Sequence, residues 1–164
     1  MSRHIEKYRK IINELIRKSF PKLKNENVQV FEIPGFFVWW VSGFVFRKCI
    51  FITSRVRKFD KKSQIGLFAH ELCHVEDSQK RPFFHTLFYS IRGCLSWAFY
   101  SSFSKRGERN TDLRVIRKGY ARELYQFEVM KERKFSKKRL SKISARGYLS
   151  SSQVKKYAKR IGKW

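Results

Sequence analysis

The chain has 164 residues, which is enough for one domain with a buried core. Its 38 Lys and Arg residues against 13 Asp and Glu residues give a formal net charge of +25, which predicts attraction to anionic lipids, nucleic acid or acidic peptides. Because the basic residues are spread along the chain, a lysine bias that only keeps the protein soluble is an equally weighted interpretation. The three cysteines show no paired spacing and no secretory signal opens the chain, so we expect a cytoplasmic protein without a disulfide framework.

Two kinds of secondary structure are predicted in the first third of the chain. A stripe of apolar side chains over residues 3 to 18 predicts an amphipathic helix that packs on the core. Alternating β-branched and aromatic residues then predict three strands, over residues 28 to 33, 36 to 46 and 49 to 56. We expect these strands to form a small, mainly antiparallel sheet.

His70 and His74 lie in an apolar run that predicts a buried helix over residues 64 to 77. At a spacing of four residues both imidazoles project from one face of the helix, which suits two corners of a tetrahedral zinc site. Glu71 lies between them, where it can reach a water on the metal and act as general base. The alternative is a surface helix with two unrelated histidines.

Residues 83 to 103 form a hydrophobic insert of about the length that a membrane span requires. Arg92, His85 and several serines interrupt it, and a charge at mid-span is costly, so a spanning helix is disfavoured. A helix packed over a cleft, or one lying in a lipid interface, fits better. His85 is assigned a structural or solvent-facing role rather than that of a fourth ligand.

Glu108 and Asp112 begin a second helical pattern, which is expected to run to about residue 128 with Gly119 interrupting it. Two histidines and one glutamate make the three-ligand set of a catalytic zinc, which leaves the fourth position for water. Asp112 is placed one turn after Glu108 to accept the free N–H of a ligand histidine. Acids are favoured near a helix start, so a solvated pair is the alternative.

The C-terminal part of the chain is densely basic. Residues 131 to 146 are expected to be partly loop. A final helix is predicted to begin near Ser151, because Ser150 and Gln153 form a capping-box pattern ahead of an apolar stripe.

These motifs resemble the signature of the gluzincin zinc peptidases, in which His-Glu-x-x-His is followed by Glu-x-x-x-Asp. The chain is similar to the archaeal minigluzincins and to the catalytic core of the HtpX-type membrane proteases. The metal motifs carry the likeness, and looser similarity extends from the strand at Cys49 to residues 147 to 150. We therefore expect an α+β fold in one domain of residues 1 to 164, with an N-terminal helix, a three-stranded sheet, an active-site helix, the insert, a ligand-bearing helix and a C-terminal helix.

The resemblance implies a zinc metalloendopeptidase with one zinc ion on His70, His74 and Glu108. Glu71 would be the catalytic base for hydrolysis of a peptide or protein substrate through a metal-bound water. Extended substrate would pair with a sheet edge that we expect to be drawn from residues 49 to 56. Tyr120 is a candidate for stabilising the oxyanion, although a half-buried helix residue is the favoured alternative for this position.

A basic module that binds a membrane surface or nucleic acid, with a structural or vestigial zinc, is the second interpretation. Glu71 speaks against it, because a purely structural site needs no such residue. The three protein ligands also leave the site open. Of the two polyanionic partners, an anionic membrane surface is favoured over nucleic acid, and peripheral membrane contact would accompany the cytoplasmic location.

Overall fold

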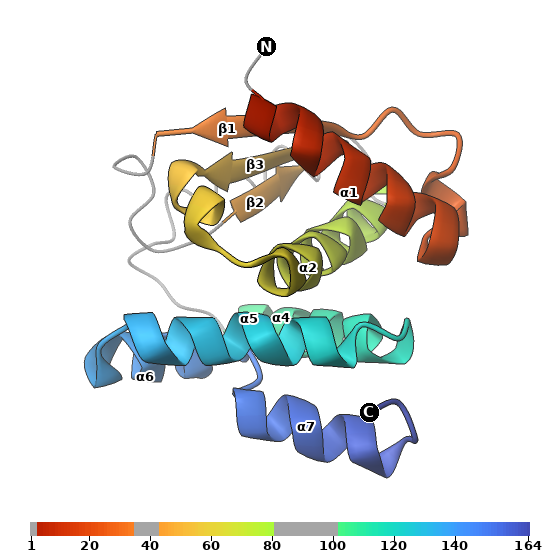
Figure 1. The fold of residues 1–164 in the computed structure, drawn as a ribbon. Coiled ribbons are helices and arrows are strands. Elements are labelled where there is room, and N and C mark those ends of the chain that lie inside the picture. The colour runs from red at the N-terminus through yellow and green to blue at the C-terminus, as the bar shows by residue number, and fades with distance from the viewer. Residues whose placement is uncertain (1–2, 35–42, 81–101) are drawn as a thin grey trace. The chain divides into compact units, whose positions relative to one another are not determined.

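A computed structural model describes residues 3–34, 43–80 and 102–164 (Figure 1). The fold is α+β as predicted, with six α-helices and a three-stranded sheet in these segments. The chain divides into two compact units, one drawn from residues 1–58 and 71–99 and the other from 59–70 and 100–164. Helix α2 (Lys61–Gln79) belongs to both, since the division falls after His70. The single domain expected from chain length stays a prediction.

The sheet of the first unit is mixed. It consists of β1 (Gln29–Ile33), β2 (Gly43–Phe46) and β3 (Cys49–Thr53) in the order β1-β3-β2. Strand β2 pairs antiparallel with β3, whereas β1 pairs with it in parallel. The three-stranded sheet is as predicted, but only one of its two strand pairs is antiparallel.

The prediction that residues 49 to 56 supply an edge of the sheet is wrong, because β3 is the central strand. It has one neighbouring strand on each side, and the two pair with it in different directions. Arg47 and Lys48 make a two-residue turn between β2 and β3, with Arg47 at a φ of 52°, and such a short turn imposes antiparallel pairing on one edge. The other edge remains for β1. The strand ends at Thr53, and residues Ser54–Lys58 form a 3₁₀ helix instead of continuing it to residue 56.

Helix α1 (Arg3–Ser19) confirms the predicted amphipathic helix, and it packs on β1. Its buried stripe consists of Tyr8, Ile11, Ile12, Leu15 and Ile16. On the solvent side, Glu6 pairs with Lys10 and Glu14 with Lys18 at a spacing of four residues. The helix is thus apolar toward the sheet and charged toward water.

Four further helices form the second unit together with the first half of α2. They are α4 (Ser102–Arg117), α5 (Ala121–Lys134), α6 (Lys137–Ala145) and α7 (Ser151–Arg160), and α4, α5 and α7 contact one another. The predicted capping box is present, since Ser150 accepts from the Gln153 N–H and the Gln153 side chain accepts from the Ser150 N–H. Residues 131 to 146 are mostly helical, in α5 and α6, and residues 135 and 136 form the break between these helices.

The helix that begins near Glu108 does not run to residue 128 as expected. Helix α4 ends at Arg117, where Gly119 adopts a φ of 93°. The Gly119 N–H donates to the Ile116 carbonyl and the Tyr120 N–H to the Val115 carbonyl, which is a Schellman termination. The glycine that was expected to interrupt one helix therefore separates two.

The segments that the structure describes include no helix both long and apolar enough to cross a membrane. The predicted hydrophobic insert at residues 83 to 103, with His85, lies outside these segments except for its last two residues, which belong to α4. The roles suggested for the insert therefore stay predictions.

Candidate metal centre

Helix α2 places His70 and His74 one turn apart. Its first turn is fixed by Asp60, whose carboxylate accepts from the Ser63 N–H at 3.0 Å and from the Ser63 hydroxyl at 2.7 Å. The helix is then buried on several sides, at Leu67, Phe68, Ala69, Leu72, Cys73 and Val75. An all-round apolar surface holds a helix rigidly within a core. The two imidazoles are therefore supported by backbone that packing restrains.

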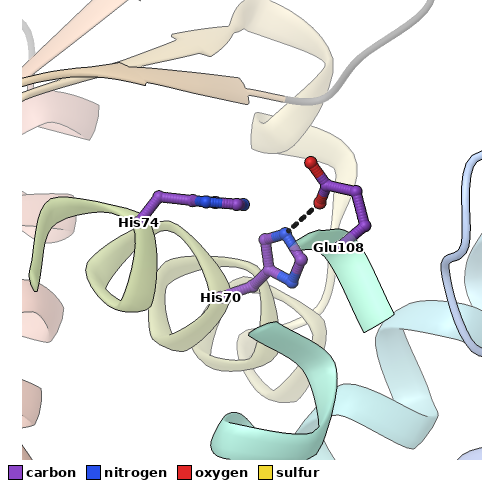
Figure 2. A group of neighbouring side chains, drawn as sticks. All are labelled: His70, His74 and Glu108. Atoms are coloured by element: carbon purple, nitrogen blue, oxygen red, sulfur yellow. Dashed lines mark ion pairs between the residues drawn. The ribbon is translucent and has the colours of Figure 1, made fainter. Parts of the chain in front are cut away.

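His70, His74 and Glu108 form a group that could hold a metal ion. Their candidate ligand atoms lie within 4.8 Å of one another, and Figure 2 shows the two histidines on α2 and the carboxylate on α4. The His70 Nε2 and Glu108 Oε2 atoms are 3.2 Å apart. Ligand atoms at the corners of a tetrahedron with zinc bonds of about 2.0 Å are separated by roughly 3.3 Å. That pair already has the spacing that a shared metal requires.

Asp112 orients His70 from the other side of the ring. Its Oδ1 atom lies 2.9 Å from His70 Nδ1, and Asp112 is fully buried. Because an ionised carboxylate only accepts, Nδ1 carries the proton and Nε2 is left to face Glu108. The predicted contact between Asp112 and one of the two histidines is therefore present. The second oxygen of Asp112, Oδ2, accepts from the Leu149 N–H at 2.9 Å.

The charged groups around His70 favour its protonated, cationic form. Burial lowers the pKa of His70, but the hydrogen bonds and negative charges of Asp112 and Glu108 outweigh it and raise this pKa well above its ordinary value. His70 itself is only 4% exposed. The same two carboxylates would stabilise a metal cation bound at Nε2.

Tyr148, Lys131 and Glu128 also belong to this site, and the motifs did not indicate a role for them. The Tyr148 ring stacks on the His70 imidazole, with centroids 5.6 Å apart and planes at 24°. Lys131 Nζ lies 4.9 Å from the centroid of the Tyr148 ring and 2.5 Å from Glu128 Oε1. Burial raises the pKa of Glu128 to about 7, although the Lys131 charge lowers it. The sequence did contain one indication that Glu128 and Lys131 are buried. They lie on the same helical face as the apolar residues Leu124 and Phe127.

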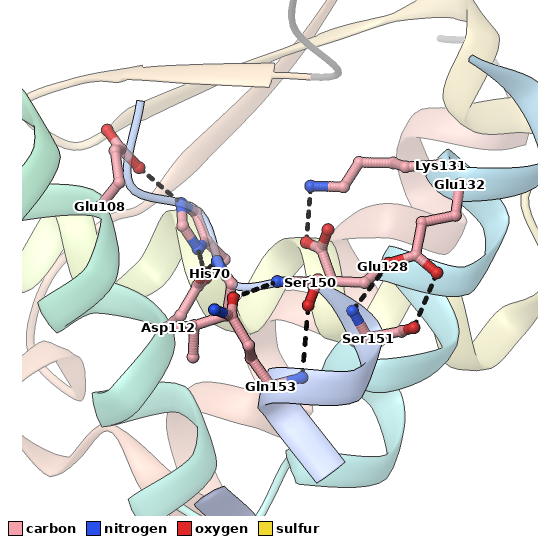
Figure 3. Close-up of polar contacts among 10 residues, drawn as sticks. His70, Glu108, Asp112, Glu128, Lys131, Glu132, Ser150, Ser151 and Gln153 are labelled. Atoms are coloured by element: carbon pink, nitrogen blue, oxygen red, sulfur yellow. Dashed lines mark hydrogen bonds and ion pairs between the residues drawn. The ribbon is translucent and has the colours of Figure 1, made fainter. Parts of the chain in front are cut away.

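The chain directly after Tyr148 is held at two points, Leu149 and Ser151, and Figure 3 shows the second of them. The Asp112 carboxylate of α4 holds the Leu149 N–H. The Glu132 carboxylate of α5 accepts from the Ser151 N–H at 2.8 Å and from the Ser151 hydroxyl at 2.7 Å. The aromatic ring on His70 is thus positioned by carboxylates from two different helices.

Two catalytic assignments from the sequence stay predictions. Glu71 is buried and directly follows His70 on α2, the helix that carries both histidines. Tyr120 lies between the end of α4 at Arg117 and the start of α5 at Ala121.

The chain matches no protein-family model, no curated protein and no solved structure. What the site can do therefore follows from its own side chains. Two imidazole nitrogens and one carboxylate oxygen, with a buried carboxylate behind one imidazole, make a donor set for a divalent metal.

Proposed function

We propose that the protein is a zinc metallopeptidase of the gluzincin type. The observation that supports this most is the grouping of His70, His74 and Glu108, with Glu71 next to His70 on the same helix. Two histidines and a glutamate are a donor set of catalytic zinc sites, which keep one position open. One zinc ion is the cofactor, and a peptide or protein is the substrate.

Glu71, Asp112 and Tyr148 would each have a different role beside a bound zinc ion. When bound, zinc supplies Lewis acidity and a water that deprotonates near neutral pH. The Glu71 carboxylate accepts a proton from the attacking water and returns it to the leaving amine. Asp112 keeps the proton of His70 on Nδ1, so that Nε2 is the ligating atom. Tyr148 covers one face of this imidazole and restricts rotation of the ring.

The second candidate is a basic module that binds an anionic membrane surface or nucleic acid. Helix α6 favours it, because none of its residues is buried and it includes Lys137, Lys138, Arg139 and Lys142. Salt-dependent binding to anionic vesicles or to an oligonucleotide, by a zinc-loaded protein that cleaves no peptide, would support this candidate over the first.

The test of the first candidate is Glu71→Gln, with zinc measured by elemental analysis and cleavage measured on a mixed peptide library. We expect about one zinc per chain to be retained and chelator-sensitive cleavage to fall by a factor of about 100 or more, because the general base is lost. Glu76→Gln removes another buried carboxylate of α2 and serves as the matched control, which should keep cleaving.

Glu108→Ala completes the design, because it should lose zinc and cleavage together. Cleavage by Glu71→Gln at the wild-type rate would contradict the proposed base. Wild-type protein that binds no zinc would contradict the proposed cofactor and leave the basic module as the better hypothesis.

A further inference from the structure

A groove lies between α4 and α7 in the second unit, with a cavity volume of about 290 Å³. Leu113 and Leu149 give it an apolar floor, and three basic side chains, Arg109, Lys156 and Arg160, lie along it. The described residues that line it include no acid. An apolar floor with several convergent polar groups is the usual composition of a binding site, and this volume is at the small end of that class.

The groove adjoins the candidate metal centre through two residues. Arg109 directly follows Glu108 in α4, so the Arg109 and Leu113 face is turned about 100° from the face that contains Glu108 and Asp112. Leu149 lines the groove and also donates its N–H to Asp112. A ligand in the groove would therefore lie against the residues that support the metal ligands.

The positive charge of the groove is available to a ligand. Arg109 and Lys156 are exposed, and neither forms an ion pair with any residue in the described ranges. Tyr157, which also lines the groove, is held by its neighbours: Arg117 donates to its hydroxyl from Nη2 at 2.9 Å, and Arg160 lies 4.9 Å from the ring centroid. The wall of the groove is thus ordered, while its charges remain unneutralised.

We propose that this groove binds an acidic segment of the peptide substrate, an inference that rests on the proposed peptidase function. A carboxylate side chain engages Arg109, Lys156 and Arg160, and a neighbouring apolar side chain lies on Leu113 and Leu149. The floor is aliphatic, and the aromatic ring in the lining, that of Tyr157, is already covered by Arg160, which favours a peptide over nucleic acid. The small volume suits a short segment rather than a folded surface.

Helix α7 offers a matched pair of double variants for the test. Lys156→Ala combined with Arg160→Ala removes two charges of the groove, whereas Lys155→Ala combined with Lys159→Ala removes two exposed charges of the same helix outside it. Both pairs are spaced four residues apart. The two proteins therefore have the same net charge, and each loses one cation–π contact, that of Arg160 with Tyr157 or that of Lys155 with Trp164.

Binding is measured by fluorescence anisotropy in zinc-loaded protein with Glu71→Gln, using a labelled short peptide of alternating glutamate and leucine and its glutamine counterpart. We expect the acidic peptide to bind more tightly than its glutamine counterpart. The Lys156 and Arg160 double variant should weaken this binding by about tenfold or more, and the affinity of the Lys155 and Lys159 double variant should stay within about twofold of the unsubstituted value. Arg109→Ala, with its zinc content verified, should also weaken binding of the acidic peptide by about tenfold or more. Circular dichroism confirms folding of each variant.

Equal weakening of peptide binding by both double variants would show that only the overall positive charge of the protein matters, and it would overturn the proposed binding site. Equal affinity for the acidic peptide and its glutamine counterpart would also overturn it. Tighter, groove-dependent binding of a single-stranded oligonucleotide would overturn the choice of a peptide. Because binding is measured without turnover, a groove that passes this test in a protein that never cleaves would contradict the proposed function alone.

Discussion

Lys131 and Glu128 show how a single buried pair can serve a neighbouring site. They are 5% and 3% exposed, and a buried ion pair is often no more stabilising than apolar residues of the same size. Its effect here is positional, because Lys131 Nζ lies 4.9 Å from the centroid of the ring of Tyr148, which stacks on His70. The pair therefore bears on the orientation of the imidazole through an intervening ring.

The raised pKa of Glu128 predicts a specific pH dependence of stability. The folded protein binds this proton more tightly than the unfolded chain, whose glutamates titrate near 4.3. The stabilisation is thus complete below about pH 4.3 and is lost as the pH rises through the folded pKa of about 7. We expect the free energy of unfolding to fall more steeply between pH 5 and 7.5 in the wild type than in Glu128→Gln, by up to about 3 kcal/mol.

Urea unfolding at several pH values measures these slopes. Glu123→Gln, a less buried carboxylate on the same helix, is the control for the removal of one acid and should keep the wild-type slope. Parallel pH profiles for the wild type and Glu128→Gln would contradict the assignment.

At the scale of elements, the contact between α2 and α5 depends on one glycine. A Cβ atom built on Gly66 would lie 2.4 Å from the Glu123 carbonyl oxygen, which is backbone and cannot turn away. Gly66 precedes His70 by about one turn of α2. The approach of these two helices therefore also determines where the first histidine is held.

Gly66→Ala should separate the helices and destabilise the protein by about 1 to 3 kcal/mol, with weaker zinc binding because His70 moves. Thermal unfolding and a competitive zinc titration measure the two effects. Gly107→Ala is the matched control, since an added Cβ there meets nothing within 4 Å. In that helix, alanine should leave stability unchanged or raise it by up to about 1 kcal/mol. Equal stability of the two variants would show that the close approach at Gly66 has no energetic consequence.

The elements also show what the sequence could predict. The spacing of His70 and His74 and that of Glu108 and Asp112 follow from the helical period, so the contact of His70 with Asp112 could be anticipated from two local patterns. The order of the strands could not be anticipated in this way. The parallel partner of β3 comes from an earlier segment of the chain, and its position depends on which edge of β3 the short hairpin leaves open.

Residues 147 to 150 were part of the family resemblance, but the contact of Tyr148 with His70 could not be predicted, for a related reason. This contact joins residues far apart in the chain, and no period or motif links an aromatic residue ahead of α7 to a histidine in α2. The break at Gly119 was visible as a glycine, but its positive φ, which divides α4 from α5, is a property of the folded backbone.

At the scale of the whole molecule, the chain has a large positive net charge, and it nevertheless buries some of its few acidic residues. The chain has 13 acids, and among the described residues the buried ones are Glu71, Glu76, Asp112 and Glu128. Asp112 touches His70 directly, and Glu71 follows His70 on α2. A metal cation on His70 would therefore compensate the buried negative charge of Asp112.

Zinc should therefore stabilise the whole fold. At a free concentration 100 times the dissociation constant, binding to the native state alone adds about 2.7 kcal/mol, or a rise in Tm of roughly 5 to 10 °C for a chain of this size. Differential scanning calorimetry with zinc and then with excess chelator measures the rise and its reversal. The same rise in Glu108→Ala would mean that zinc stabilises the protein from another site.

The hydrogen bond from Leu149 to Asp112 has a consequence for the order of synthesis. The two residues are 37 positions apart, so at about 5 to 20 residues per second a ribosome adds Leu149 roughly two to seven seconds after Asp112. During that interval the nascent chain already contains His70, His74 and Glu108, but the second oxygen of Asp112 has yet to receive its donor. The last support of the site is therefore made only after all three of its candidate ligands.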